Sequence, residues 1–332
     1  LAANTTANNN VAIGNGSMAA NTTGTFNVAV GTATMGANTT GGNNVAMGIA
    51  ALDANTTGDE NIGIGSNALG ANTTADANTA IGGGALATNT TGTNNAAVGR
   101  SALAANTTAN HNAAFGSTAL DSNTTGTQNT AVGSGAGQSN TTGSYNTTLG
   151  YAAHDALTTA SYNTAIGRYA SLALVNGSSN TTVGSAAGSA ISSGSNNTMI
   201  GYAAGDDLTT GGQNIIIGSL ANAGASGAAY RIVMGYNPSG GANDSFLIGR
   251  GSTDSQIAFG ATSITAPSDI RLKEDIQDEE VGLNFINDLR PVTFQWKKEK
   301  DIPSDMKAYK ESSEKRTMNG KYNHGFIAQE VK

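Results

Sequence analysis

The chain has 332 residues and a formal net charge of −7, with 12% charged and 5% aromatic residues beside 45 glycines. It contains no cysteine, which excludes a disulfide framework and a thiolate metal site. No apolar run approaches the roughly 18 to 20 residues that cross a bilayer, so membrane insertion is not expected. Disordered chains are typically charged and lack periodic apolar residues, whereas this chain is weakly charged and strictly periodic. Because it begins at Leu1 without Met, we expect a fragment or a processed product.

One short frame returns at a constant spacing over the first two thirds of the chain. It reads Asn, small or apolar residues, a large apolar residue and Gly, as in "NVAIG", and a degenerate copy, "RIVMG", follows at Arg231. A period this strict is typical of a repeat architecture in which each unit stacks on the next. The frame begins at Asn10, Asn27, Asn44, Asn61, Asn78, Asn95, Asn112, Asn129, Asn146, Asn163, Asn180, Asn197 and Asn214.

Alignment of the repeats predicts the elements of each coil. A large apolar residue always precedes the Gly, and the residue before it is usually Ala, which predicts a short strand with an interior face that another backbone approaches closely. A second short strand is predicted over "SALAA" and its relatives, where Leu52 and Leu69 belong to a regular Leu column. That column is lost from Gly137 onward, so we expect the second half of the solenoid to pack differently.

The turn of each coil is "NTTG" or "NTTA". Asn tolerates left-handed backbone and bonds its own main chain in turns, and identical Asn side chains on successive coils can form an amide ladder. The eleven "NTT" tripeptides satisfy the glycosylation sequon, but turn chemistry is the stronger interpretation. The sequence thus predicts an all-β rod over residues 1–235, a parallel β-solenoid (β-roll) with 17-residue coils and two strands per coil.

The thin, Ala-rich coil buries few large side chains, so we expect lateral association of the rod as a homotrimer, intertwined or packed side by side. Residues 1–267 carry four Arg, no Lys and ten acids, whereas residues 268–332 carry 12 basic and 13 acidic residues. This change indicates a domain boundary near Ser268. Neither part has the basic stripe of a nucleic-acid binder.

The spacing shortens after Gly235, with "FLIG" ending at Gly249 and "IAFG" at Gly260. Residues 236–267 are therefore predicted to form an off-period distal tip. Three blocks follow: "APSDIRLKEDI" at residues 266–276, "LRPVTFQWK" from Leu289 and "HGFIAQEV" from His324. In this order they resemble the C-terminal intramolecular chaperone of endosialidase-type phage tailspikes, which is also found in many tail fibres.

The resemblance implies a small α+β or helical chaperone segment over residues 268–332 that trimerises, templates folding of the preceding rod and cuts itself off before the Ser. By this resemblance Ser268 is the nucleophile, cleavage falls between Pro267 and Ser268, and Lys273 is the base. A neutral Lys amine requires a desolvated site or a nearby positive charge, which Arg271 would supply, and Asp269 supports the motif. The expected activity is a single turnover of a serine-lysine autoprotease, with no external substrate.

The rod repeats resemble the left-handed β-rolls of trimeric autotransporter adhesin heads and the repeats of phage tail fibres. These resemblances imply an extracellular fibre, on a virion tail or a cell surface, that binds a host glycan or protein. After cleavage the tip would be exposed, which makes its polar and aromatic residues candidates for receptor contact: Tyr236, Asn237, Asp244 and Asp254.

Alternative functions remain open at this point. A bacterial surface adhesin uses the same architecture. A glycan depolymerase needs two carboxylates about 5 to 10 Å apart, and the adjacent acids are Asp59 with Glu60 and Asp206 with Asp207. Regular Thr pairs are also compatible with an ice-binding solenoid. The dispersed histidines lack ligand spacing, so no metal is expected, and the short Gly clusters lack the strand-to-helix context of a phosphate loop, so no cofactor is expected. Five tyrosines are either sugar-stacking platforms or packing residues: Tyr145, Tyr151, Tyr162, Tyr169 and Tyr202.

Overall fold

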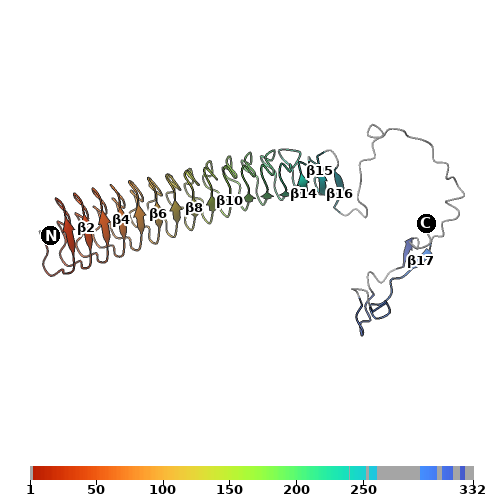
Figure 1. Ribbon diagram of the computed structural model, residues 1–332, viewed down its shortest axis with the longest axis horizontal. Coiled ribbons are helices and arrows are strands. Elements are labelled where there is room, and N and C mark those ends of the chain that lie inside the picture. Colours follow the sequence, from red (N-terminus) through yellow and green to blue (C-terminus); the bar gives the residue numbers. More distant parts are fainter. Residues whose placement is uncertain are drawn as a thin grey trace. The chain divides into compact units, whose positions relative to one another are not determined.

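The computed structural model describes residues 3–238, 240–251, 254–259, 292–304, 309–316 and 322–325. The chain divides into two compact units, Leu1–Pro267 and Ser268–Lys332. The first unit is a rod of stacked coils, in which the strands of successive coils lie side by side from the N-terminal end to β16 (Figure 1). The predicted all-β parallel solenoid with 17-residue coils is therefore confirmed.

Each coil contributes one three-residue strand to a single sheet, and the sheet order follows the sequence. The register between neighbours is constant, because Val11 pairs with Val28 and Val28 in turn pairs with Val45. The strands are β1 (Val11–Ile13), β2 (Val28–Val30), β3 (Val45–Met47), β4 (Ile62–Ile64), β5 (Thr79–Ile81), β6 (Ala96–Val98), β7 (Ala113–Phe115), β8 (Thr130–Val132), β9 (Thr147–Leu149), β10 (Thr164–Ile166), β11 (Thr181–Val183), β12 (Thr198–Ile200) and β13 (Ile215–Ile217).

The middle residue of each strand faces the interior of the rod. In β2 and β3 it is Ala, and Ala29 and Ala46 are fully buried. The Gly that follows each strand is also required by close approach, because a Cβ on Gly82 would lie 2.4 Å from the carbonyl oxygen of Gly99 and its φ is +135°. The column of Ala at the strand centre and the column of Gly after the strand thus follow from the short distance between coils.

The predicted second strand in each coil is wrong. The segment with the Leu column forms turns, and its backbone repeatedly adopts the left-handed conformation, with φ of 53° at Ala50 and 52° at Leu52. A strand requires negative φ at successive residues, so these positions curl the chain instead. The N–H groups still bond between coils, because Ala50 donates to Thr32 O at 3.0 Å and Leu52 donates to Ala68 O at 3.0 Å.

Two ladders of buried Asn side chains connect successive coils; the turn ladder ends at Asn140 and the other continues to Asn214. The turn Asn ladder matches the prediction: Asn38 Nδ2 donates to Asn21 Oδ1 at 2.8 Å and to the carbonyl of Gly41 at 3.0 Å. The second ladder, which sequence reasoning missed, uses the Asn before each strand, where the backbone N–H of Asn44 donates to Asn27 Oδ1 at 3.0 Å. Asn21 and Asn38 are fully buried, which favours turn chemistry over glycosylation.

The interior changes character along the rod, as the loss of the Leu column predicted. An N-terminal core, residues 18–136, is filled by Met18, Met35, Leu52, Leu69, Leu86, Leu103 and Leu120. A C-terminal core, residues 157–247, is filled by large residues at the position that the turn Asn occupies in the first half, namely Leu157, Leu174, Ile191 and Leu208, with Met199 and Ile216 added from the strands.

A polar junction lies in the coils where the filling of the interior changes. It consists of two hydrogen-bonded pairs, His154 Nδ1 with Thr148 Oγ1 at 2.9 Å and Ser171 Oγ with Thr182 Oγ1 at 2.9 Å. All four residues are buried. Burial lowers the pKa of His154 from 6.5 to about 3, so the imidazole is neutral in the folded rod at neutral pH.

The rod ends in longer strands, β14 (Arg231–Tyr236), β15 (Ser245–Arg250) and β16 (Ser255–Ala258). β14 pairs with β15 in parallel across a shortened spacing, in which Arg231 pairs with Ser245, whereas β16 runs antiparallel to β15. This reversal ends the parallel stack. β14 crosses the predicted boundary at residue 235, so the described part of the tip continues the sheet of the rod.

In the second unit the described residues form one antiparallel pair, β17 (Val292–Phe294) with β18 (Asn323–Gly325), and an antiparallel bridge between Lys298 and Arg316. These described segments contain no helix. The helical part that the resemblance implies stays a prediction.

Candidate functional site

The predicted processing residues lie outside the described residues. These are Pro267, Ser268, Asp269, Arg271 and Lys273. The structure does describe parts of the other two sequence blocks and brings them together, because β17 belongs to "LRPVTFQWK" and β18 to "HGFIAQEV". Thr293 pairs with His324 in the register of these strands. Two blocks that are well separated in the sequence therefore form one antiparallel strand pair.

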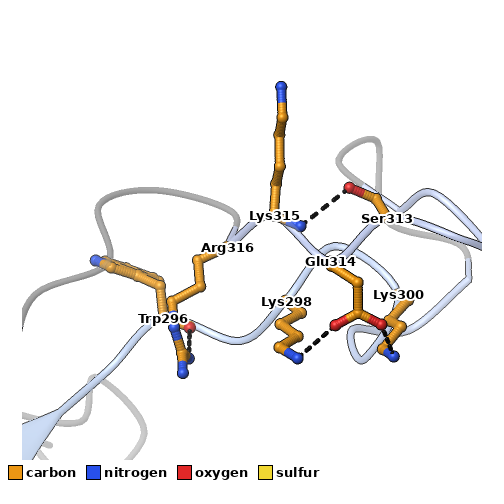
Figure 2. A network of polar contacts seen from close by, with 7 residues as sticks. All are labelled: Trp296, Lys298, Lys300, Ser313, Glu314, Lys315 and Arg316. Carbon is orange, nitrogen blue, oxygen red and sulfur yellow. Dashed lines mark hydrogen bonds and ion pairs between the residues drawn. The ribbon is translucent and has the colours of Figure 1, made fainter.

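A charged network follows β17 in the second unit (Figure 2). Glu314 accepts hydrogen bonds from Lys298 and Lys300, and these bonds lower the pKa of its carboxyl to about 2. Arg316 Nη1 donates to the carbonyl of Trp296 at 2.6 Å, and the Trp296 ring contacts Phe294 edge-on at 5.3 Å. These ion pairs are solvent-exposed, so each contributes little to the stability of the fold.

The predicted tip residues divide between the two ends of the β15–β16 hairpin. Tyr236 pairs with Arg250 at the C-terminal end of β15, and Asn237 follows Tyr236 directly. Asp254 lies at the same end, where a Cβ on Gly249 would be 2.0 Å from its Oδ1. Asp244 precedes β15 at the opposite end, and its carbonyl accepts the N–H of Phe259 at 2.7 Å. The structure thus brings three of the four candidates to one end.

Structural partners are present for three of the four adjacent acids of the rod, namely Asp59, Asp206 and Asp207. Asp59 Oδ1 accepts the backbone N–H of Gly42 at 2.7 Å, and Asp207 accepts from Ala223 at 2.9 Å and Gly224 at 2.6 Å. Desolvation and then the neighbouring charge of Asp207 raise the pKa of Asp206. These carboxylates connect successive coils, which is a structural use and gives no support to the depolymerase alternative.

The Thr pairs of the turns are used asymmetrically. The hydroxyl of the first Thr donates to the next coil, as Thr39 Oγ1 does to Thr56 O at 3.0 Å, and only the second Thr, such as Thr40, is exposed. One row of exposed hydroxyls remains instead of the two that the Thr pairs would provide. This arrangement weakens the ice-binding alternative.

The five tyrosines form two pairs and one separate residue. Tyr145 and Tyr162 stack in parallel, with centroids 4.9 Å apart and an interplanar angle of 3°. Tyr151 and Tyr169 meet edge-on at 5.6 Å. Tyr202 is exposed and has no ring partner among the described residues.

Within the described ranges, no cluster of His, Asp and Glu has the geometry to hold a metal ion. The same part of the chain contains no helix long and apolar enough to span a membrane.

Comparison with known proteins identifies the C-terminal segment. Residues 268–332 match the family Peptidase_S74, described as chaperone of endosialidase. No curated protein and no solved structure matches the chain. The match begins at the residue where the second compact unit begins. The chain therefore joins a long parallel β-solenoid to a C-terminal domain of the endosialidase-chaperone type.

Proposed function

We propose that this protein is a trimeric fibre, carried on a phage tail or a cell surface, that attaches to a host and is assembled by its self-cleaving C-terminal chaperone. The observation that carries the proposal is the connection of a solenoid of uniform register to an endosialidase-type chaperone. A parallel sheet with a strictly repeated register is slow to form and vulnerable to slippage by one coil. A template that aligns three chains before the coils form addresses that problem.

The outward face of the strands supports association of copies. The residues on either side of the buried middle position are uncharged in every strand from β1 to β13, and many are large and apolar. Phe115 is 43% exposed and Leu149 is 44% exposed in the single chain. A continuous apolar stripe of this length is unusual for a surface that faces water.

The size and period of this stripe fit a second and a third copy. At about 4.8 Å per coil and about 3.3 Å per residue, thirteen three-residue strands form a face of roughly 600 Å², which approaches the roughly 800 Å² per partner of a standard interface. A copy of the same chain repeats its side chains at the same spacing, so contacts made by one coil recur at every coil.

Native mass spectrometry tests the assembly. We expect the wild type to form trimers and Phe115→Glu/Leu149→Glu to dissociate them, because the new carboxylates of three chains would be desolvated together. Thr125→Glu/Thr142→Glu, which adds the same charge at exposed turn positions, should leave the trimer intact. A monomeric wild type, or equal effects of the two double variants, would contradict the proposal.

The proposed cleavage follows from the family resemblance. Ser268 Oγ attacks the carbonyl carbon of Pro267 while Lys273 removes the hydroxyl proton, the C–N bond breaks to release the amine of Ser268, and water hydrolyses the resulting ester to leave Pro267 as a carboxylate. Loss of the template after cleavage makes unfolding kinetically one-way.

Intact-mass measurement decides whether this cleavage occurs. We expect a wild-type fragment that ends at Pro267, which disappears in Ser268→Ala and in Lys273→Met and persists in the control Ser263→Ala. An uncut wild type would refute self-processing and leave the chaperone without release.

We place receptor contact at the exposed end of the tip, where Tyr236, Asn237 and Asp254 lie together, and Asp244 becomes a weaker candidate because it lies at the other end of the hairpin. Deletion of the tip would remove β15 and β16, so point variants are the better test. Tyr236→Ala/Asn237→Ala should reduce binding to host cells, and unchanged binding would remove the tip from the proposal.

A further inference from the structure

The rod has a hollow on its side. Its volume is about 340 Å³, and it lies over the turns that follow β7 to β10, away from the described tip. Its lining is mostly polar and includes Ser134, Gln138, Asp155, Tyr151 and Tyr169.

The hollow exists because two neighbouring columns change residue size. One column holds Thr118, Gly135, Ala152 and Tyr169 on four successive coils. Its two small residues, Gly135 and Ala152, form the floor of the hollow between the larger side chains of the coils on either side. The φ of Gly135 is +67°, and the Gln138 side chain lies over it, with Oε1 3.4 Å from the place of a Cβ. In the adjacent column Ser134 is followed by Tyr151. Two aromatic rings thus stand at one end of a small polar floor.

The rings are held in a fixed geometry. Tyr151 and Tyr169 meet edge-on, with centroids 5.6 Å apart and an interplanar angle of 67°. The guanidinium of Arg168 lies 4.6 Å from the centroid of the Tyr169 ring, which restrains that ring further. Two rings at this angle offer an apolar ring face beside an edge, instead of a single flat stack such as Tyr145 with Tyr162.

The polar groups of the hollow are available to a ligand. Among the described residues, no hydrogen bond occupies the Asp155 carboxylate, the Gln138 amide or the hydroxyls of the two tyrosines. A carboxylate accepts from hydroxyl groups, and an amide both donates and accepts. Rings for apolar C–H faces beside acceptors and donors for hydroxyls are the complement of a sugar ring.

We propose that this hollow, the lateral groove, binds a neutral pyranose unit of a glycan. The ring of the sugar would stack on Tyr151 or on the face of Tyr169 opposite Arg168, and its hydroxyls would bond Asp155 and Gln138. The lining of the hollow includes the Asp155 carboxylate and not Arg168, so it repels acidic sugars and selects a neutral unit. A pocket near the lower end of the usual size range, about 300 to 1,000 Å³, holds a small ligand of one or two rings. This inference rests on the proposed attachment function and assigns it a second, lateral site.

The test uses the full chain and ligand-observed NMR with named probes: methyl α-glucoside, methyl α-mannoside, methyl β-galactoside, N-acetylglucosamine and, as the acidic comparison, N-acetylneuraminic acid. We expect saturation transfer to at least one neutral probe. Tyr169→Ala and Asp155→Asn should each weaken that binding by about tenfold or more.

The matched control is Tyr202→Ala. Tyr202 belongs to the same column as Tyr151, is similarly exposed and lies outside the groove, so its removal should leave binding unchanged. Native mass of every variant separates loss of a sugar site from loss of the trimer. Absence of any neutral-probe signal, binding of the acidic probe alone, or binding that survives Tyr169→Ala would overturn the lateral groove.

These measurements also distinguish a failure of the lateral groove from a failure of the proposed fibre function. A trimeric, self-cleaved fibre that attaches to cells without binding any neutral probe would refute the groove and leave the fibre proposal standing. A monomeric chain that binds a neutral probe through Tyr169 would do the reverse.

Discussion

The two halves of the rod share one backbone period and fill their interiors differently. In the N-terminal core a Leu precedes a hydrogen-bonded turn Asn by three positions, as in Leu86 and Asn89. Over residues 171–208 of the C-terminal core the first position holds a small residue and the second a large one, as in Ser171 and Leu174. Buried large side chains therefore fill the coils of both halves, although their position and the presence of the turn Asn ladder differ.

Two glycines of the C-terminal half stand where the N-terminal half has Leu, and Met199 packs next to both of them. A Cβ on Gly188 would lie 2.8 Å from Met199 Cε, and a Cβ on Gly205 would lie 2.5 Å from Met199 Sδ. Met199 replaces the Ala that the strand centre carries in the first half, and it fills the space that the Leu column has vacated. At Gly188 and Gly205, Met199 thus occupies space next to the positions where the Leu side chains are lost.

The largest effect on stability is expected when the filling pattern of the C-terminal half is introduced into the N-terminal half. Leu86→Ser alone is expected to destabilise each chain by about 3 to 5 kcal/mol, because it leaves a cavity and buries a hydroxyl. The double variant Leu86→Ser/Asn89→Leu reproduces the pattern of Ser171 and Leu174 and should recover at least half of that loss. Urea unfolding of both variants measures the recovery. A double variant less stable than the single variant would show that the two ways of filling the coil are not interchangeable.

Low pH should destabilise the polar junction. Because the folded-state pKa of His154 is about 3 and its ordinary value is 6.5, stability is full above pH 6.5 and falls as the pH drops from 6.5 toward 3. At pH 4 the loss is about 3 kcal/mol per chain. Thermal unfolding at pH 7 and pH 4 measures it.

The matched variant is His154→Leu/Thr148→Ala, which copies the pairing of Leu120 with Ala114 and should lose this pH dependence. Burial also raises the pKa of Asp121 and of Asp206, and raised carboxyl pKa values favour the folded state as pH falls, so the double variant isolates the contribution of His154. Equal pH dependence in the wild type and the double variant would exclude the junction as its origin.

The turn Asn ladder is a feature of the N-terminal half, and its disruption is expected to lower the free energy of unfolding by a smaller amount. Asn72 Nδ2 donates to Asn55 Oδ1 at 2.9 Å and to the Ala75 carbonyl at 3.0 Å, and its own Oδ1 accepts from Asn89. Asn72→Ala is expected to cost about 1 to 3 kcal/mol, because buried partners lose their hydrogen bonds. Asn176→Ala, at an exposed position of the C-terminal half, should cost little. Equal losses would show that the ladder contributes nothing.

The smallest effect is expected at the surface of the C-terminal half. Tyr145→Ala removes a ring stacked on Tyr162 and should cost about 0.5 to 1.5 kcal/mol. Phe26, seven coils earlier in the same column, has no ring partner among the described residues, so Phe26→Ala is the control. A loss at Phe26 that equals the loss at Tyr145 would assign the effect to area burial alone.

Some features of the rod can be predicted from the sequence and others cannot. The loss of the Leu column at Gly137 is visible, and the periodic series of Leu157, Leu174 and Leu208 is a signal that identifies its replacement. The second Asn ladder is visible only as a repeated letter, because its role depends on the backbone N–H of the next coil. The lateral groove is not readable in the sequence, because it depends on the sizes of residues in two adjacent columns on four coils.

The period, the strand of each coil, the register and the shortened spacing after residue 235 can all be predicted from residue types that recur at fixed spacing. The path of the rest of the coil depends instead on contacts between stacked coils. Left-handed backbone at Leu52 is locally unfavourable and unpredictable from the residue, and it becomes stable because stacked coils offset its cost with hydrogen bonds to both neighbours. Those bonds exist only after the coils have stacked, which is why propensity predicted a second strand and the fold contains a turn.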